Sequence, residues 1–351
     1  MSHGEDRHGI LRSSNFELLR IFSILCVVLH HLLIDELYQC GYHSPSDGSD
    51  FIPLFINGLA IIGVNLFILI SGWFGIKSPL RSIFRIILDY VILRGIPFLI
   101  LWITQPQEFT FTDFVYTIRP SNSLFVANYI ILAVVSPILE VSMRGAKTGR
   151  LVLFVTALAF CNLYFGYYKQ FSINTDGYNA INFIFLYYIG RLLCLSKDTK
   201  ALRIMSWSAI PLWIVIAVTE ALIFQALAKV GGPSQNVRMW YYNSPFVLLS
   251  AIFVFSLFAN LKIQSKLINT IASATFGVYI LHGTLLVKQI REPITIYLFG
   301  KFGYIGVLIQ MFALAAVCYI VSLLWTLIRK GLTYKVSETL AQYDRQLMNI
   351  E

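Results

Sequence analysis

Long apolar runs, separated by short polar segments, occupy most of the chain. A helix needs about 20 apolar residues to cross the hydrocarbon core of a bilayer. Ten runs reach or approach this length, and each predicts a membrane span: 17–36, 54–75, 83–104, 123–142, 150–166, 180–196, 204–227, 243–261, 268–287 and 303–328. The sequence therefore predicts an all-α, polytopic membrane helix bundle. It divides into a cytosolic N-terminal segment at 1–14, one integral-membrane domain at 15–330 and a cytosolic tail at 331–351.

The composition agrees with a membrane protein. Of the 351 residues, 57% are hydrophobic and 13% are charged, whereas charged residues make up about 25% of a typical soluble domain. A net charge of +9 would indicate a nucleic-acid partner in a soluble protein. Here the distribution of basic residues accounts for the charge, so no nucleic acid is expected. The five cysteines lack paired spacings, so neither a disulfide framework nor a metal site is predicted.

Basic residues alternate between the two sides of the predicted spans. Most lie in segments that share a side with both termini, such as the turns after the second span (Lys77, Arg81 and Arg85) and after the sixth (Lys197 and Lys200). Because cytosolic loops are enriched in Lys and Arg, both termini are predicted to be cytosolic. The protein is then a multi-pass protein of the cell membrane, in contact with membrane lipid. The tail is expected to form a short amphipathic helix on the inner surface.

The first span holds ionisable residues, which are rare in membranes and usually face a bundle interior or a watery cavity. Arg20 and His31 are 11 positions apart, and eleven steps of ~100° return a helix to within ~20° of its starting direction. Both side chains are therefore predicted to lie on one face. His30 points about 80° away from that line, so it is expected to pack against another helix. Simpler interpretations remain open: Arg20 as a basic surface anchor, and His31 as a hydrogen-bonded histidine at the membrane interface.

The ninth span places His282 at about the same depth as His31, with Tyr279 one helical turn earlier. Two histidines at matching depth indicate a shared site. The second span ends with Ser71 and Gly72, close to the basic turn that contains Arg81 and Arg85. Small residues beside basic ones at a membrane mouth suit a phosphorylated ligand, although contact with lipid headgroups would also explain them.

Two further features have simpler explanations in a membrane protein. Asp89 follows Arg85 by four residues and is predicted to pair with it. The aromatic residues Trp240, Tyr241 and Tyr242 are typical of an interfacial belt, and a stacking surface for sugar rings is the alternative.

Together these stretches resemble the acyltransferase 3 family, whose members are integral-membrane enzymes that modify sugars and cell-surface polysaccharides in bacteria. Arg20 and His31 match the family pattern of arginine, ten residues and histidine. The segments "LFILISGWFGI", "FLYYIGRLL" and "TFGVYILHG" also resemble family segments and occur in the expected order. The family often has Arg-x-x-Arg after the second span, whereas here Arg81 and Arg85 are one residue further apart.

The resemblance implies O-acylation, most often O-acetylation, at the bacterial inner membrane. Acetyl-CoA would be a cytosolic co-substrate, with no resident cofactor, and the acceptor would be a hydroxyl of a glycan or a lipid-linked sugar. The donor is expected to bind at four residues near the inner mouth: Arg85, Arg81, Ser71 and Gly72.

The catalytic roles follow from the same resemblance. His31 is expected to act as the general base or as a transient acyl carrier, and Arg20 to hold the donor. His282 and Tyr279 would orient His31, bind the acceptor or stabilise the oxyanion. The alternative function is a transporter or flippase for a glycan or a small solute, because buried arginine and histidine residues also serve proton coupling. No clear repeated half with broken helices, a common sign of a transporter, is apparent in the sequence.

Overall fold

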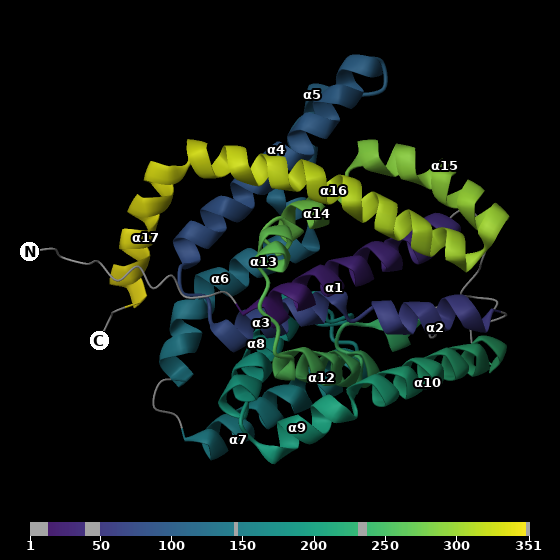
Figure 1. The fold of residues 1–351 in the computed structure, drawn as a ribbon. Helices are drawn as coiled ribbons and strands as arrows, with labels where there is room; N and C mark the ends of the chain where they lie inside the picture. Colours follow the sequence, from purple (N-terminus) through teal and green to yellow (C-terminus); the bar gives the residue numbers. More distant parts are fainter. Residues whose placement is uncertain (1–12, 39–49, 144–146, 231–236, 349–351) are drawn as a thin grey trace, which may run out of the picture.

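The computed structural model describes residues 13–38, 50–143, 147–230 and 237–348, which form a helical bundle without strands (Figure 1). The all-α prediction is therefore confirmed. The helices are α1 (Ser14–His31), η1 (Leu32–Tyr38), α2 (Phe51–Ala60), α3 (Gly63–Phe74), α4 (Pro79–Thr104), α5 (Phe111–Thr117), η2 (Pro120–Asn122), α6 (Leu124–Met143), α7 (Thr148–Phe160), η3 (Cys161–Tyr168), α8 (Ala180–Leu195), α9 (Lys200–Trp207), α10 (Ala209–Val230), η4 (Val237–Trp240), α12 (Pro245–Asn260), α13 (Lys266–Ala272), α14 (Thr275–His282), α15 (Leu285–Phe302), α16 (Tyr304–Leu332) and α17 (Tyr334–Met348).

Within this part of the chain, eight helical segments are long and apolar enough to cross a membrane, and two bent helix pairs raise the number to ten. The first pair, α8 with α9, bends by 111°, and the second, α13–α14 with α15, bends by 83°. The predicted number of spans therefore agrees only if each bent pair counts as one. Residues 288–302, which lie between two predicted spans, belong to helix α15. Hydropathy did not reveal this helix, because it contains charged residues such as Lys288, Arg291 and Glu292.

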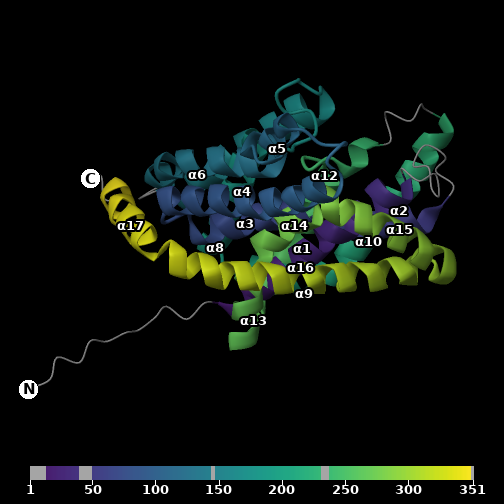
Figure 2. The same cartoon turned by 90° about the horizontal axis from the view of Figure 1, so that it is seen from above.

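Helix α1 lies in the middle of the bundle and packs against α2, α3, α12, α13, α14 and α16. Figure 1 shows α16 on one side of it and α10 with α12 on the other, and Figure 2 shows α6 and α16 on opposite flanks. A helix that is apolar on nearly all sides is typically buried, and Leu19, Ile24 and Val28 of α1 are fully buried. The central position of α1 brings its polar residues inside the protein and away from lipid.

Two glycines bring the backbones of α3 and α8 into direct contact. A Cβ atom at Gly72 would overlap the backbone of Tyr187, and one at Gly190 would lie 3.0 Å from the Cα of Gly72. Small residues at such crossings allow the close approach that membrane helices use for packing. Gly72, which the sequence predicted to bind the donor, thus contributes to helix packing in the structure.

The tail forms helix α17, as its amphipathic pattern predicted, and packs against the start of α4. The buried Asp344 carboxylate accepts hydrogen bonds from the backbone N–H groups of Leu80 (2.8 Å) and Arg81 (3.1 Å). These N–H groups have no partner within their own helix, and the positive end of the helix dipole favours a carboxylate there. Helix α17 therefore binds the first turn of α4.

Candidate active site

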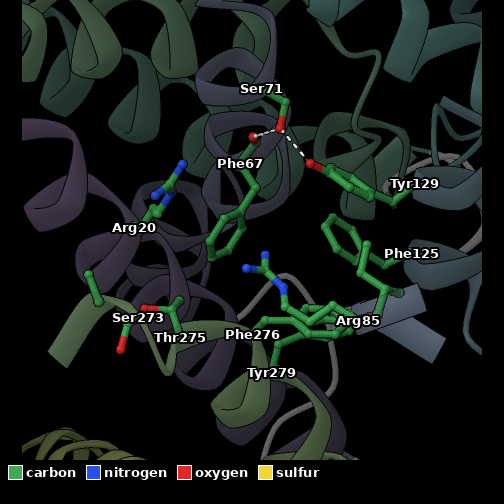
Figure 3. Close-up of a pocket in the computed structure, with 12 residues that line it drawn as sticks. Arg20, Phe67, Ser71, Arg85, Phe125, Tyr129, Ser273, Thr275, Phe276 and Tyr279 are labelled. Atoms are coloured by element: carbon green, nitrogen blue, oxygen red, sulfur yellow. Dashed lines mark hydrogen bonds between the residues drawn. The ribbon is translucent and has the colours of Figure 1, made fainter. Parts of the chain in front are cut away.

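A cavity of about 170 Å³ opens between α1, α3, α4, α6 and the α13–α14 segment. We call it the arginine cavity, and Figure 3 shows its side chains. Its lining consists of Arg20, Phe67, Ser71, Arg85, Ile86, Phe125, Tyr129, Ala272, Ser273, Thr275, Phe276 and Tyr279. Four of the residues predicted from the sequence to form a site, Arg20, Ser71, Arg85 and Tyr279, thus lie around one space. They come from four different helices.

The two arginines of this cavity differ in their partners. Arg20 forms an ion pair with the buried Glu17 carboxylate, at 2.7 Å between Nη1 and Oε1. Arg85 reaches into the middle of the cavity (Figure 3) and has no ion-pair partner within the described part of the chain. Ser71 adds a hydroxyl that donates to the Phe67 carbonyl (3.0 Å) and lies 3.1 Å from the Tyr129 hydroxyl. Because guanidinium groups bind phosphate oxygens well, this wall suits an anionic ligand.

Asp89 does not pair with Arg85, so that prediction was wrong. Its Oδ1 atom lies 2.8 Å from Nε of Arg329 and accepts a hydrogen bond of 2.7 Å from the indole N–H of Trp325. Both partners come from α16, more than 200 residues away in the sequence. The sequence analysis missed them because Arg329 looked like one more basic residue near the tail. Their contact with Asp89 leaves Arg85 available to a ligand.

His31 and His282 meet at the ends of α1 and α14, with their ring centroids 5.2 Å apart. The structure thus brings together the two histidines that the sequence placed at one depth. His282 is buried, and its Nδ1 atom lies 3.0 Å from the Val278 carbonyl oxygen. A carbonyl only accepts, so Nδ1 carries the proton and Nε2 keeps a lone pair. Tyr279, with its ring centroid 5.9 Å from that of His282, connects this pair to the arginine cavity.

A second, smaller cavity of about 50 Å³ lies beside the histidines, and we call it the histidine cavity. It is lined by Val27, His30, His31, Ala60, Ile61, Val64, Tyr178 and Tyr242. His30 faces α2, as its helical position predicted, and its Nδ1 atom lies 2.6 Å from Oδ1 of Asn57. Arg20 and His31 therefore belong to the same helix but line different cavities.

Buried asparagines position the two tyrosines of the histidine cavity. Their side chains are linked in series, from Asn182 to Asn162 (2.9 Å), Asn174 (2.6 Å) and Asn179 (2.7 Å). Asn243 then donates to the Asn174 carbonyl at 3.0 Å. This asparagine network ties residues 169–179 to residues 241–244. The sequence analysis did not single out these residues, because their contacts join four separate stretches of the chain.

The aromatic segment 240–242 only partly resembles an interfacial belt. Trp240 is buried and stacks on Phe224, with centroids 4.7 Å apart, and Tyr242 lines the histidine cavity.

Arg81, expected to bind the donor, lies in the exposed first turn of α4 and does not line the arginine cavity. Its backbone N–H binds Asp344.

A comparison with family models agrees with this arrangement. A model described as an acyltransferase domain, Acyl_transf_3, matches residues 13–328, which is nearly the whole chain and includes every residue that lines the two cavities. No curated protein and no solved structure matches the chain.

Proposed function

Since the chain belongs to the acyltransferase 3 family, we propose that this multi-pass membrane acyltransferase moves an acyl group from cytosolic acyl-CoA to a hydroxyl of a cell-surface or exported glycan. The acyl group is acetyl and the membrane is the bacterial inner membrane, as the family resemblance implies. Acetyl-CoA is a co-substrate that leaves as CoA after each turnover.

One observation supports this proposal above the others: the arginine cavity ends at Tyr279, beside the histidine pair. An unpaired cation thus lies at one end of a path and two imidazoles lie at the other. Along α1, the eleven-position step from Arg20 to His31 corresponds to roughly 16 Å. An elongated donor with a polyanionic head and a reactive thioester at its far end suits this spacing.

The donor's phosphates bind Arg85, because this guanidinium has no carboxylate partner among the described residues. Arg20 binds more weakly, since Glu17 already neutralises part of its charge. Ser71 and Tyr129 supply hydroxyls on the same wall. The pantetheine arm then extends toward Tyr279 and brings the thioester up to the boundary between the arginine cavity and the histidines.

His31 takes the proton from the acceptor hydroxyl, because a neutral imidazole is a suitable base near neutral pH. The acceptor oxygen attacks the thioester carbonyl, the C–S bond breaks, and the departing thiolate takes the proton to give CoA thiol. His282, whose ring centroid lies 5.2 Å from that of His31, orients the His31 ring. The Tyr279 hydroxyl donates to the oxyanion. In a second route, His31 itself is acylated first and then passes the group on.

Cells with and without the protein provide the test, with mass spectrometry of surface glycans as the readout. Wild-type protein should add acyl groups, and His31→Ala should abolish them while the protein remains in the membrane. Ser142→Ala is the matched control, because Ser142 bonds Tyr188 at 2.8 Å on a part of α6 that lines neither cavity. Unchanged acylation by a folded His31→Ala variant would rule out this mechanism. Rapid-quench trapping of acyl-histidine separates the two routes.

A further inference from the structure

The arginine cavity and the histidine cavity meet at a pair of tyrosines. Tyr279 lines the first cavity and Tyr178 lines the second. The Phe183 and Phe125 rings connect the two side chains, since Tyr178 contacts Phe183, Phe183 contacts Phe125 and Phe125 contacts Tyr279. The Tyr279 hydroxyl lies 3.3 Å from Oγ of Ser123. Both tyrosines therefore belong to one aromatic cluster at the boundary between the cavities.

Other aromatic rings extend this boundary on both sides. The Phe125 ring lies 4.9 Å from Tyr279, and the Tyr242 ring lies 4.7 Å from Tyr178. Phe183 fills the corner, with its centroid 5.8 Å from Phe125 and 6.3 Å from Tyr178. We call these five residues the aromatic partition. It separates the space where the donor binds from the space beside His31.

Tyr178 belongs to a connecting segment, as Tyr242 does, whereas Phe125, Phe183 and Tyr279 lie on helices of the bundle. It directly precedes Asn179, whose side chain caps the start of α8, and the asparagine network holds its segment in place. Burial raises the pKa of the Tyr178 hydroxyl well above its usual value, so the group stays protonated and remains a donor.

The proposed chemistry requires such a barrier. A base that activates a sugar hydroxyl also activates water, and water is far more concentrated than any glycan. A thioester beside His31 would be hydrolysed unless water is kept out until the acceptor arrives.

We propose that Tyr178 determines the choice of the acceptor over water: as part of the aromatic partition, it closes the donor space against water from the histidine cavity, and the acceptor displaces it. This inference rests on the proposed function. The reaction that Tyr178 suppresses is attack of a water oxygen on the thioester carbonyl. The C–S bond breaks, and CoA thiol and a carboxylate form.

Hydrolysis of labelled acetyl-CoA by the purified protein, without any acceptor, tests the inference. Tyr178→Ala should raise the rate of CoA release about tenfold over wild type, because water then reaches the thioester. Tyr178→Phe keeps the ring contacts of the partition, so its rate should stay close to that of wild type. Tyr168→Ala is the matched control, since Tyr168 is 65% exposed and lies outside the partition. A folded Tyr178→Ala variant with the wild-type rate of hydrolysis would overturn the inference.

Thiol labelling provides a readout that does not depend on activity. Thr275→Cys places a reporter in the arginine cavity of a variant whose native cysteines are replaced. A membrane-impermeant thiosulfonate is then applied from the side of residues 169–179. The reporter should be protected when Tyr178 is present and should react when it is alanine. Rapid labelling with Tyr178 intact would contradict the partition. If labelling depends on Tyr178 but no glycan is acylated, the proposed function fails and the partition stands.

Discussion

Arg85 is the basic side chain that the arginine cavity leaves free for a ligand. Its neighbour Asp89 is held by Arg329 and Trp325, and Arg20 is held by Glu17. Arg85 is exposed to the arginine cavity, so a ligand anion can contact its guanidinium without displacing a carboxylate partner. Its contribution should therefore appear in donor binding and not in the chemical step.

Replacing Arg85 with alanine should raise KM for acetyl-CoA and change kcat little. A hydrogen bond to a charged group contributes about 1.5–3 kcal/mol, which corresponds to a roughly 10–100-fold change in affinity. Arg81→Ala should leave KM within about fivefold, since exposed ion pairs contribute at most ~1 kcal/mol. Steady-state kinetics with purified protein measure both. Equal effects of the two substitutions would mean that Arg81 also binds the donor, as the sequence predicted. The donor site would then extend beyond the residues that line the arginine cavity.

At the scale of single residues, helical periodicity predicted part of the site. It placed Arg20 and His31 on one face of the first span. The position of His282 in the ninth span, at about the same depth as His31, identified the second histidine. It did not reveal Arg329, whose role depends on a contact with Asp89 across more than 200 residues. Tyr178 was also missed, because a loop tyrosine at a membrane boundary is common and gains significance only beside Tyr279.

The contact between α3 and α8 depends on glycine at Gly72 and Gly190. Gly72→Ala would place a methyl group against the Tyr187 carbonyl, so the helices must separate or bend. Overpacking of this kind costs about 1–3 kcal/mol, and it would also displace Ser71 from the arginine cavity. Thermal unfolding in detergent should show a lower transition temperature. Gly149→Ala in α7 is the control, because nothing lies within 4 Å of the added atom, and it should unfold like wild type.

Helix α17 is fastened to α4 by one carboxylate. Asp344→Ala removes both acceptors from the first turn of α4, and the loss of a cap costs about 0.5–2 kcal/mol. The tail should then detach more often, and limited trypsin digestion after Lys335 and Arg345 should be faster. Glu338→Ala alters an exposed contact to Tyr334 on the same helix and should leave the rate unchanged. A tail that resists digestion equally in both variants would show that the apolar contacts of α17 suffice.

Element boundaries followed the apolar pattern well where a span is straight. The predicted span 83–104 lies within α4, and 123–142 is nearly identical to α6. The pattern failed at the two bent pairs. The break after His282 depends on how α14 and α15 pack against α16. The charged residues of α15, such as Lys288 and Arg291, ended the predicted span before this helix.

At the scale of the whole molecule, contacts between distant segments indicate which chain ends share a side. Ser14 at the start of α1 binds the backbone of Ser265 at the α12–α13 turn. Asp344 in the tail binds the start of α4. These four segments are the ones that the distribution of Lys and Arg predicted to be cytosolic. Packing and charge thus agree on the grouping, although neither depends on the other.

The orientation itself is therefore a strong prediction. Both termini should lie in the cytosol, because their side of the bundle carries most of the basic residues, and α5 with Asp113 should lie on the opposite side. A fluorescent protein fused after Glu351 should fluoresce, whereas alkaline phosphatase inserted at Asp113 should be active in the periplasm. The same phosphatase inserted between α12 and α13, at Gln264, is the control and should be inactive. A reversed pattern would place the basic arginine cavity on the side that lacks CoA, and the donor would then have to be a different acyl compound.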